Sequence, residues 1–120
     1  MSVMSPESTL AGELWISFVA MVRSYSGIWA GQIREEALVQ EAENAVTVAM
    51  GPARLNLRID PASGEGVWSR AGGGAAAENG SFRLLPEGCI SFGEKTLDLD
   101  HAAIDLAAAL LAAAKTARGL

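Results

Sequence analysis

The sequence predicts an α+β fold: an antiparallel sheet of four to six strands in meander order, flanked by N-terminal and C-terminal helices on one face. Apolar residues recur at helical spacing near both ends of the chain, and the middle alternates between apolar and polar residues. Short turns containing Gly and Pro separate the alternating runs. Consecutive strands joined by short turns pair antiparallel, and the terminal helices can then cover one face. With 120 residues, we expect a single α+β domain over residues 1–120.

The first helix is predicted to begin at Ser5-Pro6-Glu7, which supplies a capping hydroxyl, a proline for the first helical position and an acid for the first turn. The segment Leu10–Val22 contains one charged residue and is apolar nearly all round. Such a helix has to be covered on more than one side. We therefore expect a second copy of the chain to cover the flank that the sheet leaves open. The candidate interface residues are Leu10, Leu14, Trp15, Phe18, Val19 and Val22. Gly27 is expected at the end of this helix.

The segment Gly31–Asn44 is compatible with two structures. It is rich in good helix formers, and Ile33, Ala37 and Leu38 share a helical face, which favours a short, mostly exposed helix. The alternative is a strand over Ala37–Glu41 that leads into a hairpin. We expect the helix.

The rest of the chain predicts strands followed by a second helix. In the clearest strand, Leu55, Leu57 and Ile59 point one way, while polar residues that include Arg54 and Arg58 point the other way. The predicted strands are Ala45–Met50, Arg54–Asp60, Gly66–Arg70, Ser81–Leu85, Cys89–Phe92 and Thr96–Leu99. The last helix is predicted to begin at Asp98 or Asp100 and to end before Gly119. Its nine alanines permit close docking within the chain, which we favour, or against a partner helix.

Composition excludes several classes of function. The formal net charge is −5, only two lysines are present, and no basic run exists, so nucleic-acid binding is disfavoured. The thirteen-residue segment Leu10–Val22 falls short of the roughly 20 residues that span a bilayer, and it lacks the positive flank of a signal peptide, so we expect no membrane partner. A single cysteine excludes an intrachain disulfide and favours a reducing compartment, so we expect a cytoplasmic protein.

One cluster of side chains could bind a metal ion: Asp98, Asp100, His101 and Asp105. Carboxylates and one imidazole can hold a divalent cation, but aspartates at a helix start ordinarily cap free N–H groups. We favour capping and expect neither a metal nor another cofactor. Cys89 and His101 could formally form a catalytic dyad, although a cysteine in an apolar strand is usually inert. The glycine-rich loop at 72–74 lacks the lysine of a phosphate-binding loop. We therefore expect no enzyme.

The remaining residues support two hypotheses about function. The first is a non-enzymatic protein-interaction module, a homodimer that uses the N-terminal apolar helix and presents its sheet or its acidic surface to another protein. The alternative is a protein that binds a small apolar ligand in a pocket between helices and sheet. The candidate pocket residues are Trp15, Trp29, Trp68, Phe82 and Phe92.

Overall fold

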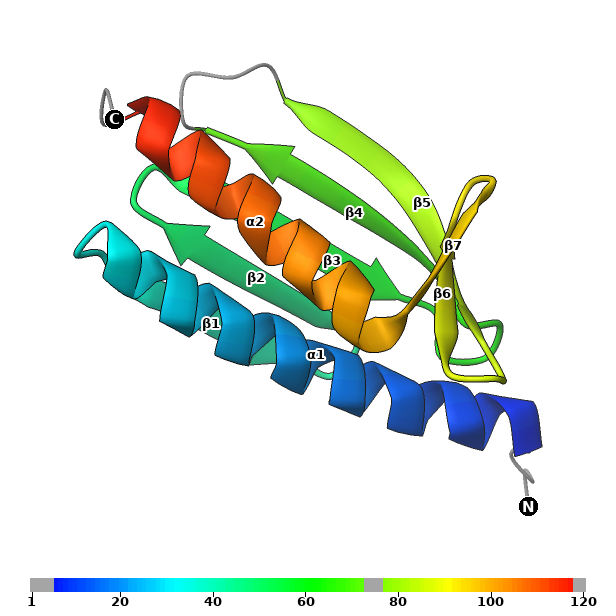
Figure 1. Cartoon of the computed structure of the whole chain (residues 1–120). Coiled ribbons are helices and arrows are strands. Elements are labelled where there is room, and N and C mark those ends of the chain that lie inside the picture. The colour runs from blue at the N-terminus through cyan, green and yellow to red at the C-terminus, as the bar shows by residue number, and fades with distance from the viewer. Residues whose placement is uncertain (1–5, 73–76, 118–120) are drawn as a thin grey trace.

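The computed structural model confirms the α+β class and the meander, and it contains one strand more than the range predicted. It describes residues 6–72 and 77–117, with side chains from residue 11 onward. Helix α1 (Pro6–Gln32) and helix α2 (Leu99–Ala117) lie on the same face of a seven-stranded antiparallel sheet whose strands follow sequence order (Figure 1). The strands are β1 (Ala37–Ala42), β2 (Ala45–Met50), β3 (Ala53–Ile59), β4 (Glu65–Ala71), β5 (Glu78–Leu85), β6 (Cys89–Phe92) and β7 (Lys95–Asp98).

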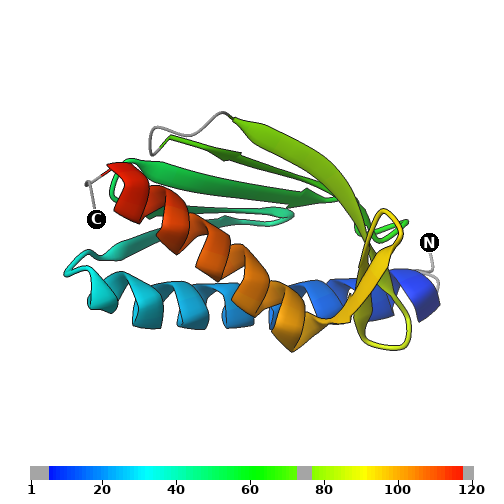
Figure 2. The same ribbon diagram turned by 45° about the horizontal axis from the view of Figure 1, so that its top comes forward.

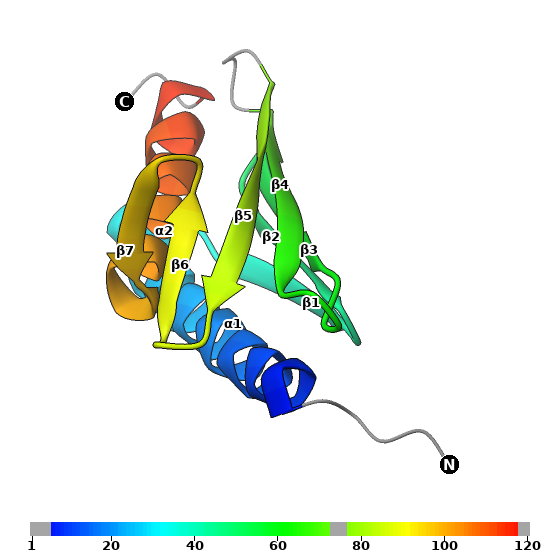
Figure 3. The same cartoon turned by 90° about the vertical axis from the view of Figure 1, so that its right-hand side faces the viewer.

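The sheet arches over the two helices, which form a second layer beneath it (Figure 2). Strands β1 to β5 form most of the arch. The short hairpin of β6 and β7 bends away from β5 and lies beside the beginning of α2 (Figure 3). The inner face of the sheet therefore packs on helices, while the outer face is open to solvent.

Helix α1 does not end at Gly27 as predicted; it continues to Gln32. The helix ends where Arg34 adopts a left-handed conformation with φ 57°. The N–H of Arg34 donates to the carbonyl of Gly31, and the N–H of Glu35 donates to the carbonyl of Ala30. These two bonds are those of a Schellman motif, which satisfies carbonyls at the end of a helix. A glycine alone does not end a helix whose following residues still pack against the core. The helix therefore continues beyond Gly27, and Ala30 in its last turn is buried.

The prediction of a helix within 31–44 is wrong, and the alternative strand is correct. Residues Ala37–Ala42 form β1, which pairs with β2 through a two-residue turn at Glu43 and Asn44. Helix propensity differs among ordinary residues by less than about 1 kcal/mol, so hydrogen bonding to an adjacent strand overrides it. Because β1 lies at the edge of the sheet and has no fully buried residue, its sequence lacks the alternation that identified the other strands.

The predicted alternation of β3 is confirmed: every second residue from Ala53 to Ile59 is buried, and the residues between are exposed. The turn before it consists of Gly51 and Pro52. Gly51 has φ 59°, which suits the first central position of a type II′ turn, and the fixed φ of proline suits the second.

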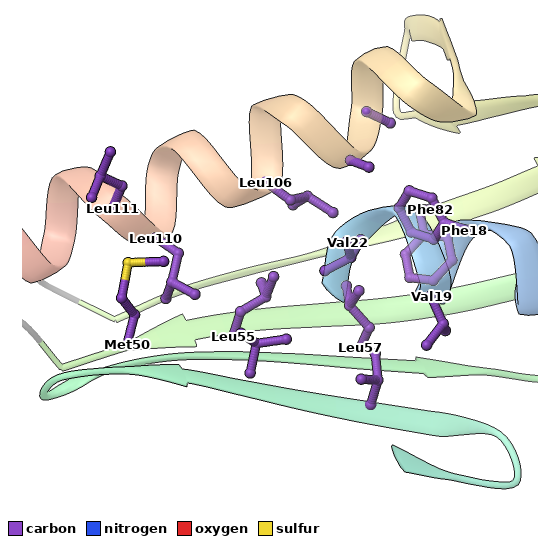
Figure 4. Packing of buried hydrophobic residues seen from close by; sticks show 14 of the residues in the cluster. Phe18, Val19, Val22, Met50, Leu55, Leu57, Phe82, Leu106, Leu110 and Leu111 are labelled. Carbon is purple, nitrogen blue, oxygen red and sulfur yellow. The ribbon is translucent and has the colours of Figure 1, made fainter. Parts of the chain in front are cut away.

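The core lies between the sheet and the two helices (Figure 4). Helix α1 contributes Phe18 and Val22, which are fully buried, and α2 contributes Leu110. The inner face of the sheet contributes apolar side chains from β2, β3 and β5, which pack against those of the helices. Both helices thus bury one face against the sheet and one flank against each other.

Helix α2 begins next to the predicted capping residue. Asp98 accepts a hydrogen bond from the backbone N–H of His101 at 2.6 Å, which caps the helix. Four alanines of α2 have no exposed surface: Ala102, Ala103, Ala107 and Ala114. The helix therefore docks closely within its own chain, as predicted. Neither helix, over its described residues, combines the length and apolarity needed to cross a membrane.

Candidate functional site: the outer face of helix α1

The structure places most of the predicted interface residues in the core of a single chain. Trp15, Phe18, Val19 and Val22 are all buried, and Leu14 is half-buried. The side chain of Leu10 lies outside the described residues. We expected a second copy to cover one flank of this segment, but α2 provides that cover, because it lies against α1 beneath the sheet (Figure 1).

A different face of α1 is left open. Ile16 is 70% exposed, and Ile28 further along the same helix is 63% exposed, whereas Trp15, Phe18, Val19 and Val22 are buried. Ile16 belongs to a row of residues spaced by four, four, three, four and four positions along the helix. We call this row the α1 stripe: Gly12, Ile16, Ala20, Arg23, Gly27 and Gly31. At 3.6 residues per turn, these positions fall within about 100° of the helix surface.

The three glycines of the α1 stripe have no explanation within the described chain. A Cβ atom added to Gly12, Gly27 or Gly31 would have no neighbour within 4 Å. Glycine inside a helix is about 0.5–1 kcal/mol less favourable than alanine. Where glycines are required in the sheet, a close contact explains them: a Cβ on Gly80 would lie 2.7 Å from the indole nitrogen of Trp68. The α1 stripe therefore has room for an atom group that the chain itself does not supply.

The α1 stripe adjoins the free edge of the sheet. Its one charged residue, Arg23, donates through Nη1 to both carboxylate oxygens of Glu41 on β1, at 3.1 and 3.2 Å. A groove of about 120 Å³ lies between α1 and β1, and Ile16 and Ala42 are among its lining residues. Because β1 is an edge strand, its outer backbone groups have no neighbouring strand among the residues that the structure describes. Helix and edge strand thus form one continuous flank.

The weak metal-site candidates are engaged elsewhere. Asp98 caps α2, and Asp100 accepts a 2.5 Å hydrogen bond from the hydroxyl of Tyr25 on α1. This hydrogen bond, followed by burial and by the negative charges of Asp100 and Asp98, raises the pKa of Tyr25. Asp105 lies 3.9 Å from both His101 and Lys95. Within residues 6–72 and 77–117, no three side chains of the types His, Cys, Asp or Glu are grouped so that they could hold a metal ion.

The formal dyad is not assembled either. Cys89 is half-buried in β6 and lies opposite Asp98 of β7. His101 follows on the exposed side of α2, and among the described side chains its charged neighbour is Asp105. The part of the glycine-rich loop at 73–76 lies outside the described residues.

The aromatic residues predicted to line one pocket lie in two different environments, the buried core and a partly exposed crevice. Trp15 and Phe82 are buried, and they belong to a chain of rings with centroids 6.1–6.5 Å apart that runs through Phe18 to Phe92. Trp29 packs half-buried against the core. Trp68 and Phe92 line a crevice beside α2. The sequence alone did not separate these environments, because helical and strand periodicity mark the inner face without showing how completely it is covered.

The outer face of the sheet carries a feature that the sequence analysis did not interpret as a site. Two adjoining hollows, of about 550 and 480 Å³, share Arg58 and Val67 in their lining. A polar row crosses this face: Thr47 donates to Asn56 at 2.8 Å, and Asn56 donates to Ser69 at 3.3 Å. The only sequence signal for this surface was the polar side of the alternation in β3.

Comparisons with models of protein families, with curated proteins and with solved structures find no match to this chain. Its function therefore has to be inferred from the geometry.

Proposed function

We propose that this protein is a homodimeric, non-enzymatic protein-interaction module whose self-association surface is the α1 stripe. The observation that carries the proposal is the open space beside three helical glycines next to an exposed Ile16. The role of α1 in association thus belongs to a face adjacent to the one that the apolar sequence indicated.

The α1 stripe has the symmetry that a two-fold dimer requires. A two-fold axis placed between Ala20 and Arg23 runs two α1 helices antiparallel and sets Ile16 opposite the partner's Gly27. The same axis sets Gly12 opposite the partner's Gly31. The spacing of four, four, three, four and four reads the same in both directions, so one patch supplies both the protruding group and the gap that receives it. Self-complementarity of this kind defines an isologous interface.

Packing energetics support this arrangement. Burying an isoleucine side chain contributes roughly 1.5–3 kcal/mol, and the symmetric dimer buries two of them. The glycines let the helices approach closely, because interaxial distance depends on the side chains at the contact. At a rise of 1.5 Å per residue, the α1 stripe is about 29 Å long, and the adjoining edge strand can enlarge the contact area. The Arg23 charge near the two-fold axis is already paired with Glu41.

A dimer formed in this way leaves the outer face of the sheet open. That face holds the two hollows around Arg58. Arg54 lies on the same face of the same strand, four residues before Arg58. We propose that another protein is contacted there, because the face combines unpaired arginines, among the described side chains, with hydrogen-bonding groups such as Asn56.

The test is the oligomeric state of three proteins: wild type, Ile16→Asp and Val67→Asp. Sedimentation velocity between about 1 and 100 μM should show a dimer for the wild type. Ile16→Asp should be monomeric, because it places a carboxylate against the partner's helix in a desolvated contact. Val67 is 55% exposed on the outer face of the sheet, so Val67→Asp is a matched control for the loss of an exposed apolar side chain and should remain dimeric.

A wild-type protein that sediments as a monomer throughout this range contradicts the proposal. So does a dimer that persists in Ile16→Asp and dissociates in Val67→Asp, because this result moves self-association to the outer face of the sheet. Circular dichroism of each variant shows whether the fold is retained.

A further inference from the structure

A crevice of about 220 Å³ opens between α2 and strands β4, β6 and β7, and none of its lining residues belongs to α1. The crevice is therefore separate from the α1 stripe and would remain accessible in the proposed dimer. Its lining residues are Trp68, Phe92, Lys95, Leu97, Ala102, Asp105 and Leu106.

Two glycine–aromatic pairs lie on the inner face of β4 and β5, and the pair that contains Trp68 explains the space at the crevice. Trp68 on β4 lies opposite Gly80 on β5, and Gly66 on β4 lies opposite Phe82 on β5. Each ring lies across the glycine of the neighbouring strand, so that a Cβ on Gly80 would lie 2.7 Å from the indole nitrogen. An aromatic ring that lies flat over a glycine of the sheet extends less far toward the helix, which leaves space between the ring and α2. Facing them, α2 presents the small side chain of Ala102.

The walls of the crevice are apolar and remain partly exposed to water. Trp68, Phe92 and Leu97 are half-buried, whereas Leu57 opposite Trp68 and Ile90 opposite Leu97 are buried. An apolar cavity of about 150 Å³ accepts a benzene molecule. The crevice is larger than this, and its aromatic wall suits the face of a flat ring system.

The rim of the crevice is charged. Lys95 Nζ lies 3.9 Å from Asp105 Oδ2, and His101 Nε2 lies 3.9 Å from Asp105 Oδ1. Both oxygens of the carboxylate thus face a basic side chain already. The ammonium of Lys95 lies beyond hydrogen-bonding distance of Asp105, and its side chain is 66% exposed. Lys95 is therefore ion-paired without a hydrogen bond, and its exposed ammonium keeps donors for a further acceptor.

We infer that the crevice binds a small, flat aromatic carboxylate. Its ring lies between Trp68 and Leu106, and its carboxylate accepts hydrogen bonds from Lys95. A neutral aromatic compound gains the ring contacts alone, and an aromatic amine adds a second cation beside Lys95. This inference goes beyond self-association and does not depend on it.

The experiment is a titration followed by two-dimensional ¹H–¹⁵N NMR, with three probes that share one ring system. The probes are 2-naphthoate, 2-naphthalenemethanol and 2-naphthylmethylamine. For 2-naphthoate we expect saturable shifts at the indole N–H of Trp68 and at the amides of Ala102 and Leu106. For a ligand of this size in an open crevice, the dissociation constant should be about 0.1–1 mM. The alcohol and the amine should bind more weakly.

The sequence contains only two lysines, which provides a matched pair of variants. Lys95→Gln removes the charge at the rim and should weaken 2-naphthoate binding about two- to fivefold, as expected for an exposed charge pair. Lys115→Gln, in the last turn of α2, should leave binding unchanged.

Three results would overturn the inference: no saturable shifts, shifts that map away from the crevice, or equal binding of 2-naphthoate by Lys95→Gln and wild type. An alcohol or an amine that binds as tightly as the acid would exclude the proposed role of the carboxylate. The titration is repeated on Ile16→Asp, where binding should persist; the result therefore stands whether or not the protein is a dimer.

Discussion

Helices α1 and α2 both contain many small residues, but they use them in opposite ways. In α2, several alanines face inward: Ala103 and Ala107, for example, have no exposed surface and let the helix approach its neighbours. In α1, Gly27 and Gly31 face outward, where a Cβ atom would meet nothing within 4 Å. A small residue at a contact is explained by that contact. A glycine facing open space inside a helix costs stability without an intrachain gain, whereas an exposed alanine does not, which is the reason for placing self-association on α1 and not on α2.

The largest effect is expected from the buried side of α1. Phe18 has no exposed surface, so Phe18→Asp places an unpaired charge in the core and should destabilise the fold by about 3–5 kcal/mol. This is a large fraction of the roughly 5–15 kcal/mol that holds a domain folded. Urea denaturation of Ile16→Asp, two residues away on the open side, provides the comparison and should show a change within about 0.5 kcal/mol for the monomer. Equal losses in both variants would mean that the two sides of α1 do not differ.

The close docking of α2 predicts the next effect. Ala103→Leu inserts a larger side chain into a filled space and should cost about 1–3 kcal/mol. Ala112 is exposed on the same helix, so Ala112→Leu should be nearly neutral. Denaturant midpoints of the two variants measure the difference. A tolerated Ala103→Leu would show that the alanines of α2 are not at a tight contact.

Ser26 is the one polar residue among the fully buried positions of the described chain, and its hydroxyl has no hydrogen-bond partner there. Removing a buried, unpaired hydroxyl relieves its desolvation, so Ser26→Ala should stabilise the fold by about 1 kcal/mol. Ser24 lies two residues earlier in the same helix and is exposed, so Ser24→Ala provides the control. A loss of stability in Ser26→Ala would show that the hydroxyl has a partner after all.

Gly27→Ala separates the stability of the chain from its association. Alanine should stabilise the monomer by about 0.5–1 kcal/mol, because it favours the helix and its methyl group meets no neighbour. The same methyl group fills the gap that receives the partner's Ile16, so the dimer should weaken. Thermal melts at low concentration and sedimentation at high concentration measure the two effects. Gly80→Ala, which forces a Cβ against Trp68, should instead lower stability.

The smallest effect concerns the contact between the two helices. The hydroxyl of Tyr25 donates to Asp100, and this bond raises the pKa of Tyr25 above its ordinary value near 10. The folded state therefore holds the phenol proton more tightly than the unfolded chain does. The stabilisation is complete below about pH 10 and is lost as the pH rises through the raised value. Melting temperatures at about pH 8 and pH 11 should fall less between these pH values in Tyr25→Phe than in wild type.

Local pattern was sufficient where a side chain's partner lies nearby in the chain or on an adjacent strand. The alternation around Leu55 predicted β3 with its buried and exposed faces, and Asp98 was identified as a capping residue from its position before a helix. Pattern failed for Ala37–Ala42, because an edge strand has little burial to impose alternation, and for Gly27, because glycine weakens a helix without ending it.

The candidate site required the tertiary structure. The apolarity of Leu10–Val22 correctly indicated cover on more than one flank, but a sequence does not state whether that cover comes from the same chain or from another. The docking of α2 buried Phe18 and Val22 and left Ile16 exposed. Likewise, strand register set Trp68 against Gly80 and so opened a crevice that no spacing in the sequence reveals.

The sequence by itself determined the class of fold, the order of the elements apart from β1, and the inward face of β3, because these follow from periodicity and turn chemistry within a few residues. Only the tertiary structure decided which face of α1 is covered and where a crevice remains. These depend on contacts between residues far apart in the chain: Tyr25 and Asp100 meet across 75 positions, and no local pattern encodes that distance.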